Sequence, residues 1–243
     1  MSAAAVVVAG GEGRRLGGGR KQFRRLGVAP LLAWCCEALA RHPGVSELVV
    51  IVPVDVAEAP PSWLAAVADR VVAGGATRRE SVRRGLAAVE GAHDVVLVHD
   101  GARPFLSEAL VDRVLEAAAV GPAIPGLPLS DTVKMVGDDG RVRATLDRDL
   151  LRAAQTPQGF PLALLRELHE SAAGDDGGPD GGAAAGGVTD DAYLCERAGV
   201  PVRVVPGEAW NVKVTTALDL AFARWWAESG AAEAAGVRSP PAT

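Results

Sequence analysis

A dense group of glycines and cations follows the first apolar run of the chain, in the segment VVVAGGEGRRLGGGRKQF. Glycine lets backbone N–H groups approach a ligand closely, and arginine and lysine add positive charge, so this composition is typical of an anion-binding loop. The segment is not a P-loop, because Gln22 rather than a hydroxyl residue follows Lys21. It also lacks a dinucleotide fingerprint, since Leu16 occupies the third glycine position and no acidic residue ends a second strand about 20 residues later.

Two hypotheses remain for this segment: a glycine-rich surface turn with solvated arginines, or a loop that binds a nucleoside triphosphate, as in nucleotidyltransferases. In the second hypothesis, glycine N–H groups face the phosphates while Arg15 and Lys21 supply positive charge. Attack on an α-phosphorus builds negative charge on its non-bridging oxygens and on the departing pyrophosphate. Fixed cations stabilise that transition state more than the ground state, and so they accelerate the reaction.

Asp100 is the second candidate for chemistry, because it stands where an apolar strand ends and a glycine turn begins, in VHDGARP. In open α/β sheets the carboxyl ends of the strands form the binding crevice. A carboxylate there can hold Mg²⁺, which prefers oxygen ligands and bridges phosphates. The alternative is that Asp100 only caps the turn, and we interpret the neighbouring His99 as structural.

The segment GGATRRES is the third candidate, since two glycines precede a predicted helix that carries early hydroxyls and arginines. Helix starts attract anions, and backbone without side chains can contact the edge of a base. The alternative is that the hydroxyls of Thr77 and Ser81 only cap the helix.

An α/β fold must position these motifs. Short apolar runs predict strands at Ala4–Ala9, Glu47–Val52, Arg70–Val72, Asp94–Val98, Pro122–Ile124 and Pro201–Val205. Amphipathic stretches predict helices at Pro30–Arg41, Ser62–Ala68, Arg78–Val89, Ser107–Ala119, Leu162–Ser171, Asp190–Ala198 and Thr215–Glu228. This alternation indicates a Rossmann-like, mostly parallel sheet with helices on both faces.

Two segments depart from the alternation. Leu127–Arg148 contains Asp139-Gly140 between alternating residues, which predicts a β-hairpin arm at about 130–148, of a kind that often contacts a partner subunit. Ala172–Gly187 is rich in glycine, alanine and aspartate, so we expect a mobile loop there. We expect a single domain over residues 1–230 and a flexible tail over residues 231–243.

The composition narrows the class of protein. A net charge of −5 over 243 residues does not favour nucleic-acid binding, because the arginines and lysines gather locally around residues 14–25. Cys35, Cys36 and Cys195 show neither a disulfide framework nor metal-ligand spacing, which fits a cytoplasmic protein. We expect no signal peptide and no membrane span, because the first apolar run stops at Gly10 and the other runs are too short.

Several short motifs occur together in a fixed order between Ala9 and Thr215: AGGEGRRL with KQF, GGATRRESV, VHDGARP, DTVK, LDR, QTPQGF, TDDA and NVKVT. Together they resemble the 2-C-methyl-D-erythritol 4-phosphate cytidylyltransferase family. The resemblance implies a fold of the nucleotide-diphospho-sugar transferase type. It also implies transfer of a cytidylyl group from CTP to 2-C-methyl-D-erythritol 4-phosphate in the non-mevalonate isoprenoid pathway, with pyrophosphate as the second product. Some relatives carry a fused cyclodiphosphate synthase, which we do not expect in this chain.

The resemblance also implies roles for individual residues. The CTP would be bound by Ala9, Gly10, Gly11, Gly13, Gly75, Ala76 and Ser81. The catalytic cations would be Arg15, Lys21 and Lys213. The sugar-alcohol phosphate would be surrounded by Asp100, Arg103, Thr132, Arg148 and Thr156, with Asp100 also holding Mg²⁺ or another divalent cation. A homodimer is implied as well, in which the arm is swapped so that Thr132 and Arg148 serve the neighbouring site.

The sequence departs from the family pattern at two places. Arg20 precedes the loop lysine, where proline is common, so we expect a more mobile loop. Ala209 and Trp210 stand before Asn-Val-Lys, where many members have an acidic residue, and Glu208 lies further back. A second carboxylate on the metal is therefore not predicted, and we interpret Trp210 as a packing residue.

Three rival functions stay open at this point. A ribitol-5-phosphate cytidylyltransferase differs mainly in the methyl branch of its acceptor, a difference worth only about 1–3 kcal/mol in a pocket. A GTP-dependent nucleotidyltransferase of cofactor maturation would share the phosphate loop. A non-catalytic nucleotide-binding protein is disfavoured, because the chain retains Arg15, Lys21, Asp100 and Lys213.

Overall fold

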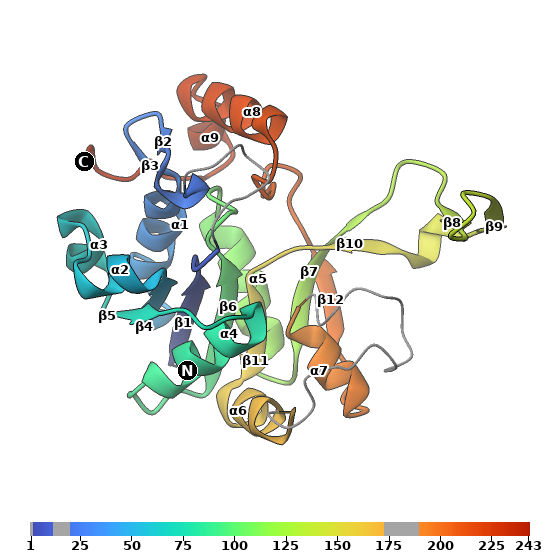
Figure 1. Ribbon diagram of the computed structural model, residues 1–243, viewed down its shortest axis with the longest axis horizontal. Coiled ribbons are helices and arrows are strands. Elements are labelled where there is room, and N and C mark those ends of the chain that lie inside the picture. Colours follow the sequence, from blue (N-terminus) through green and yellow to red (C-terminus); the bar gives the residue numbers. More distant parts are fainter. Residues whose placement is uncertain (1, 12–19, 173–189) are drawn as a thin grey trace.

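A mostly parallel sheet forms the centre of the computed structural model, which describes residues 2–11, 20–172 and 190–243 (Figure 1). The parallel half joins four strands, namely β1 (Ala3–Val8), β4 (Val45–Val52), β5 (Arg70–Ala73) and β6 (Val95–Asp100). These strands are rich in valine, and β1, β4 and β6 are buried along most of their length. Continuous apolar runs of this kind suit strands with helices on both faces. The predicted fold class is confirmed.

The other half of the sheet is mixed. Strand β11 (Gln158–Pro161) runs antiparallel to β6, and β7 (Ala123–Pro128) pairs antiparallel with β10 (Arg152–Ala154) and parallel with β12 (Arg203–Pro206). The sequence predicts strands at β7 and β12 but not at β10 and β11. Their sequences, RAA and QGFP, are too short and too poor in β-branched residues to be recognised as strands.

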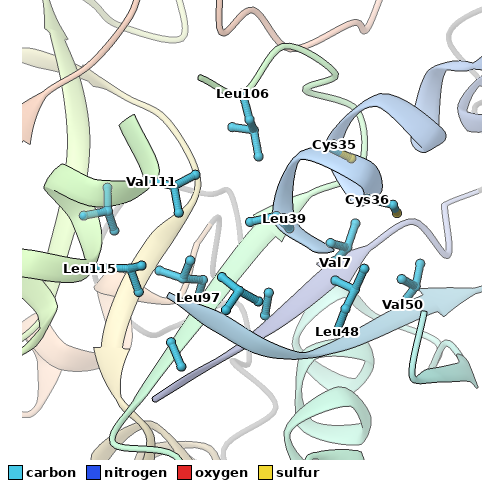
Figure 2. Packing of buried hydrophobic residues seen from close by; sticks show 14 of the residues in the cluster. Val7, Cys35, Cys36, Leu39, Leu48, Val50, Leu97, Leu106, Val111 and Leu115 are labelled. Atoms are coloured by element: carbon cyan, nitrogen blue, oxygen red, sulfur yellow. The ribbon is translucent and has the colours of Figure 1, made fainter. Parts of the chain in front are cut away.

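Helices cover both faces of this sheet. One face packs against α1 (Leu31–Ala40) and α5 (Glu108–Ala118), together with Leu64 of α3 (Ser62–Val67). Figure 2 shows this core, in which Cys35, Cys36 and Leu39 of α1 lie near Val7, Val50 and Leu48 of the sheet. The opposite face packs against α4 (Arg78–Ala88), α6 (Leu162–Ser171) and Cys195 of α7 (Ala192–Arg197). The short helix α2 (Val54–Glu58) follows β4.

A third apolar cluster lies at the C-terminal end of the chain. Helix α8 (Ala217–Glu228) contributes Trp226, whose ring packs 4.4 Å from that of Phe105, and Trp34 lies edge-on to Phe105 at 5.6 Å. Two short strands, β2 (Arg25–Leu26) and β3 (Ala29–Pro30), adjoin this cluster. The sequence predicts a flexible tail from residue 231, but the structure places a short helix there, α9 (Ala231–Ala234), with Ala232 and Val237 buried in the same cluster.

The predicted hairpin is confirmed as a small sheet of its own. Strands β8 (Lys134–Val136) and β9 (Val142–Thr145) pair antiparallel, and Gly140 takes a φ of +74° in the turn between them, where glycine avoids strain. Figure 1 shows this arm projecting away from the central sheet. The predicted mobile loop over Ala172–Gly187 lies, apart from its first residue, outside the described residues. Within the described ranges, every helix is too short or too polar to cross a membrane.

Candidate active site

Asp100 occupies the carboxyl end of β6, and its buried carboxylate faces three cations. The ammonium of Lys213 lies 2.8 Å from Oδ2 of Asp100. The Nε of Arg78 lies 3.6 Å from Oδ1, and the Nε of Arg103 lies 3.8 Å from Oδ2. The predicted residues Asp100, Arg103 and Lys213 are thus brought together, with Arg78 as an addition.

These cations determine the charge state of Asp100. Burial acts to raise the pKa of its carboxyl group, but Lys213, Arg78 and Arg103 outweigh burial and lower the pKa to about 2. Asp100 is therefore ionised near neutral pH. Arg78 also pairs with Asp191, so three cations face two carboxylates, and the remaining positive charge suits an anionic ligand.

Lys21 forms a hydrogen bond with the segment that carries Lys213. Lys21 lies in a short helical turn, η2 (Lys21–Phe23), and its ammonium donates to the carbonyl of Val214 at 2.8 Å. The N–H of Val214 donates to the carbonyl of Ala102 at 2.8 Å, which ties this segment to the turn after Asp100. The two predicted cations, Lys21 and Lys213, therefore meet beside the same turn.

Thr156 lies behind Asp100, and its Oγ1 accepts a hydrogen bond from the backbone N–H of Asp100 at 3.1 Å. Arg103 is held by two carbonyls, because its guanidinium donates to Asn211 at 2.9 Å and to Ala154 at 3.3 Å. Thr156 and Arg103 are therefore both fixed against the turn that carries Asp100. Thr156 comes from a distant part of the sequence, whereas Arg103 ends the turn itself.

The predicted nucleotide-binding loops also meet. A Cβ atom added to Gly74 would lie 3.5 Å from the Cα of Gly10, so the loop after β1 and the loop after β5 approach closely there. Gln22 holds the start of the first loop, since its amide donates to the carbonyls of Ala9 at 2.7 Å and Gly11 at 3.1 Å. The backbone at Ala9, Gly10 and Gly11 is thus placed beside the second loop.

The second loop is stabilised from within. The N–H of Gly75 donates to Oγ of Ser81 at 3.0 Å, and the N–H of Ala76 donates to the carboxylate of Glu80 at 2.7 Å. Thr77 caps α4, because its hydroxyl accepts from the N–H of Glu80. The capping role of this motif is therefore present, and the assignment of Gly75, Ala76 and Ser81 to the cytidine stays a prediction.

The remaining four predicted site residues are Thr132, Arg148, Gly13 and Arg15. Thr132 and Arg148 are exposed at the two ends of the arm, where the guanidinium of Arg148 donates to the carbonyl of Ser130. Gly13 and Arg15 lie outside the described residues.

A buried polar cluster beside Arg78 is not predicted from the sequence. The carboxylate of Asp191 accepts from the guanidinium of Arg78 at 2.8 Å and lies 3.0 Å from Nε2 of His169. Burial acts to raise the pKa of Asp191, but the charge of Arg78 and the contact with His169 lower it. Arg78 thus bridges Asp191 and Asp100. Arg78 and Asp191 both lie in motifs of the sequence, but the spacing of these motifs does not indicate the contact.

The structure shows the contacts made at both departures from the family pattern. Arg20 makes a two-pronged ion pair with Asp55 of α2, with both contacts at 2.6 Å. Glu208 accepts from the hydroxyl of Ser107 at 2.7 Å and from Arg113 at 2.9 Å, and these bonds direct it towards α5. Trp210 stacks on Trp226, which fits the packing role predicted for it. Within the described ranges, no group of three or more acidic, histidine or cysteine side chains is arranged to hold a metal.

The family model of 2-C-methyl-D-erythritol 4-phosphate cytidylyltransferases (IspD) matches residues 3–229 of the chain. The chain belongs to this family. A cytidylyltransferase of this name from Frankia casuarinae is 46% identical over 231 residues, covering 90% of this chain and 79% of the relative. One from Syntrophus aciditrophicus is 40% identical and covers 90% of this chain and 93% of the relative.

Other relatives are longer than this chain. The bifunctional IspD/IspF enzyme of Chelativorans is 44% identical over 227 residues, and the chain spans about half (54%) of its length while 90% of the chain is matched. The solved 4-diphosphocytidyl-2C-methyl-D-erythritol synthase from Anaerococcus prevotii superposes with a TM-score of 0.79 at 30% identity, covering 93% of this chain and 95% of that one. The corresponding cytidylyltransferase from Thermus thermophilus gives 0.75 at 38% identity, with 93% and 99% covered.

The ion pairs of Asp100 predict its behaviour in acid. A group whose pKa is lowered by folding stabilises the native state above its unfolded pKa of about 4, and this stabilisation is lost as the pH falls towards the folded pKa. We expect ¹³C NMR to show the Asp100 carboxyl titrating near pH 2. Between about pH 4 and pH 2, the free energy of unfolding should fall less steeply for Asp100→Asn than for the wild type. Asp138→Asn, on the exposed arm, is the control. A titration midpoint near 4 would contradict this assignment.

Proposed function

We propose that the protein transfers a cytidylyl group from CTP to 2-C-methyl-D-erythritol 4-phosphate, giving 4-diphosphocytidyl-2-C-methyl-D-erythritol and pyrophosphate. The observation that carries the proposal is the convergence of Lys21, Lys213, Arg103 and Arg78 on the turn that holds Asp100. Membership of the family adds support, as do the relatives named for this reaction at 40% and 46% identity.

The chemistry needs cations more than it needs a base. A phosphomonoester is largely a dianion near neutral pH, since its second pKa is about 6. It can therefore attack the α-phosphorus of CTP directly, in line with the departing pyrophosphate. The protein has to hold the two anions together and neutralise the charge that builds up. In this proposal Lys21 stabilises the triphosphate side, while Arg103 and Lys213 hold the attacking phosphate.

Mg²⁺ is the cofactor that we propose, with Asp100 as its protein ligand. The donor set fits an ion that arrives with its nucleotide: Mg²⁺ commonly binds through one or two carboxylates plus substrate phosphates. Asp100 is already shared with Lys213 at 2.8 Å, so free Mg²⁺ has a poor site until phosphates supply further oxygens. When bound, the ion would supply positive charge to the phosphate oxygens.

We infer a cytoplasmic location as well, because Cys35, Cys36 and Cys195 are buried free thiols.

Pyrophosphate release with different substrates tests the proposed function. We expect turnover with CTP, Mg²⁺ and methylerythritol phosphate, and its loss when GTP replaces CTP or when the metal is chelated. The same assay with ribitol 5-phosphate tests the nearest rival, since the methyl branch is worth only about 1–3 kcal/mol in a pocket. Turnover with ribitol phosphate but none with methylerythritol phosphate would overturn the proposed acceptor. Nucleotide binding without any turnover would favour the non-catalytic alternative.

Lys21 should act mainly in the transition state. We expect Lys21→Ala to lower kcat by about 10²- to 10³-fold, the scale found when one group that stabilises a developing oxyanion is removed. The circular dichroism spectrum should be unchanged, because Lys21 lies at the edge of the fold in a three-residue turn. Arg41→Ala, an exposed change at the end of α1, is the control and should leave kcat as it is. A near-normal kcat for Lys21→Ala would refute the role.

We also propose a homodimer in which the arm of one subunit completes the site of the other. The arm supports this proposal with exposed apolar side chains, since Met135, Val136 and Val142 are each at least half exposed. Such side chains are typical of a surface that a partner covers. Thr132 and Arg148, which lie on the arm and at its base, would then contact the partner's bound acceptor.

Subunit mixing tests this arrangement. Arg148→Ala removes a cation from the arm and Lys21→Ala removes one from the body, so each variant should be nearly inactive. In a mixed dimer, the body that carries Lys21 receives the arm that carries Arg148, and one intact site results. Mixing equal amounts should therefore restore about a quarter of the wild-type activity. A monomeric mass by light scattering with full activity would refute the shared site.

A further inference from the structure

A chain of buried hydrogen bonds lies directly behind Asp100. His99 is fully buried and Thr156 is only 4% exposed. The Nδ1 atom of His99 lies 3.0 Å from Oγ1 of Thr156, and its Nε2 atom lies 2.9 Å from the carbonyl oxygen of Arg103. The imidazole therefore connects the strand end at Asp100, the segment at Thr156 and the turn at Arg103.

The partners of His99 determine where its proton lies. A carbonyl oxygen only accepts hydrogen bonds, so the Nε2 atom must carry the proton and donate to Arg103. In the neutral imidazole Nδ1 is then an acceptor, and the Thr156 hydroxyl donates to it. Cys35 also lies beside the ring, but its thiol donates to the carbonyl of Leu32 at 3.3 Å and replaces neither partner.

This proton arrangement fixes the direction of the Thr156 hydroxyl. Its only hydrogen points to His99, and one of its lone pairs accepts from the backbone N–H of Asp100 at 3.1 Å. A hydroxyl oxygen has two lone pairs, so one lone pair of Thr156 is still available. Thr156 can therefore accept a hydrogen bond from a ligand but cannot donate one. A phosphate dianion has only acceptors on its oxygens and cannot use this position, whereas an alcohol group can.

We propose that His99 is a positioning residue for the reaction. It orients Thr156, which holds the backbone of Asp100, and it holds the carbonyl of Arg103, whose N–H also bonds to the carbonyl of Asp100 at 2.9 Å. His99 thereby sets the directions of the Asp100 and Arg103 side chains. It also makes Thr156 an acceptor for a hydroxyl group of the sugar alcohol, and not for its phosphate. The identity of that ligand rests on the proposed function.

Two substitutions separate the two bonds of His99. Asparagine carries its amide near the position of Nδ1, so His99→Asn keeps an acceptor for Thr156 and loses the bond to Arg103. Glutamine reaches the position of Nε2, so His99→Gln keeps the donor to Arg103 and frees the Thr156 hydroxyl. We expect His99→Gln to raise the KM for the sugar-alcohol phosphate by roughly tenfold, with the KM for CTP changed less than about twofold. His99→Asn should change the acceptor KM less and lower kcat more.

A merely structural histidine would behave differently, since both variants would then lose stability without separating KM from kcat. His42→Gln is the matched control: this histidine is also buried, and it bonds to the N–H of Gly44 away from Asp100. It should lower stability and leave both KM values unchanged. Equal KM values for His99→Gln and the wild type would overturn the proposal.

A measurement that does not depend on turnover completes the test. ¹⁵N NMR distinguishes the two neutral tautomers of histidine, and we expect the His99 proton on Nε2. A proton on Nδ1 would overturn the proposal, even in a protein with the expected activity. Conversely, if the wild type did not use CTP and methylerythritol phosphate while His99 carried its proton on Nε2, the proposed function would fail and the positioning of Thr156 would stand.

Discussion

The balance of charge around Asp100 is the constraint on which the rest of this structure depends. A buried carboxylate is costly unless cations and hydrogen bonds compensate it. Here Lys213 lies 2.8 Å away, and Arg78 and Arg103 lie within 4 Å, so the carboxylate is compensated, and one positive charge remains although Arg78 is shared with Asp191. The same cations that stabilise Asp100 also suit the turn to an anionic ligand. The stability of the buried carboxylate and the attraction for anions are thus two consequences of one arrangement.

The sheet supplies the positions that this arrangement requires. Strands β1 and β6 pair in parallel from Ala3 with Val95 to Val8 with Asp100, so the glycine loop and the carboxylate leave the sheet at the same edge. The loop after β5 joins them where Gly74 approaches Gly10. Lys213 comes from a segment more than 100 residues later, tied to the turn by the bond from Val214 to Ala102. Apolar strands buried on both faces hold these loops in register. The positions of the polar residues at the carboxyl ends of the strands therefore depend on the packing of the sheet.

Local patterns in the sequence predict much of the fold and of the candidate site. The parts that they do not predict depend on contacts between distant residues. Asp100 could be recognised because it ends an apolar run, and the helices could be recognised by their periodicity. The bond between Arg78 and Asp191 joins residues 113 positions apart, and no local pattern reports such a contact. The strand at Gln158–Pro161 forms because it can pair with β6 and β7. Its own residues do not predict a strand. The C-terminal segment packs because Ala232 and Val237 meet the aromatic cluster, although its composition resembles a flexible tail.

The two departures from the family pattern have a common physical basis in charge pairing. Arg20 brings an additional cation to the end of the glycine loop, and Asp55 of α2 neutralises it through two short contacts. That pair sits at the surface, where solvent screens ion pairs, so it can give way to another anion at little cost. Glu208 is the opposite case, since it is buried and bonded to Ser107 and Arg113, and moving it would remove the partner of both groups. The acidic group nearest in sequence to Lys213 is therefore held in the scaffold, and it does not neutralise the cations around Asp100.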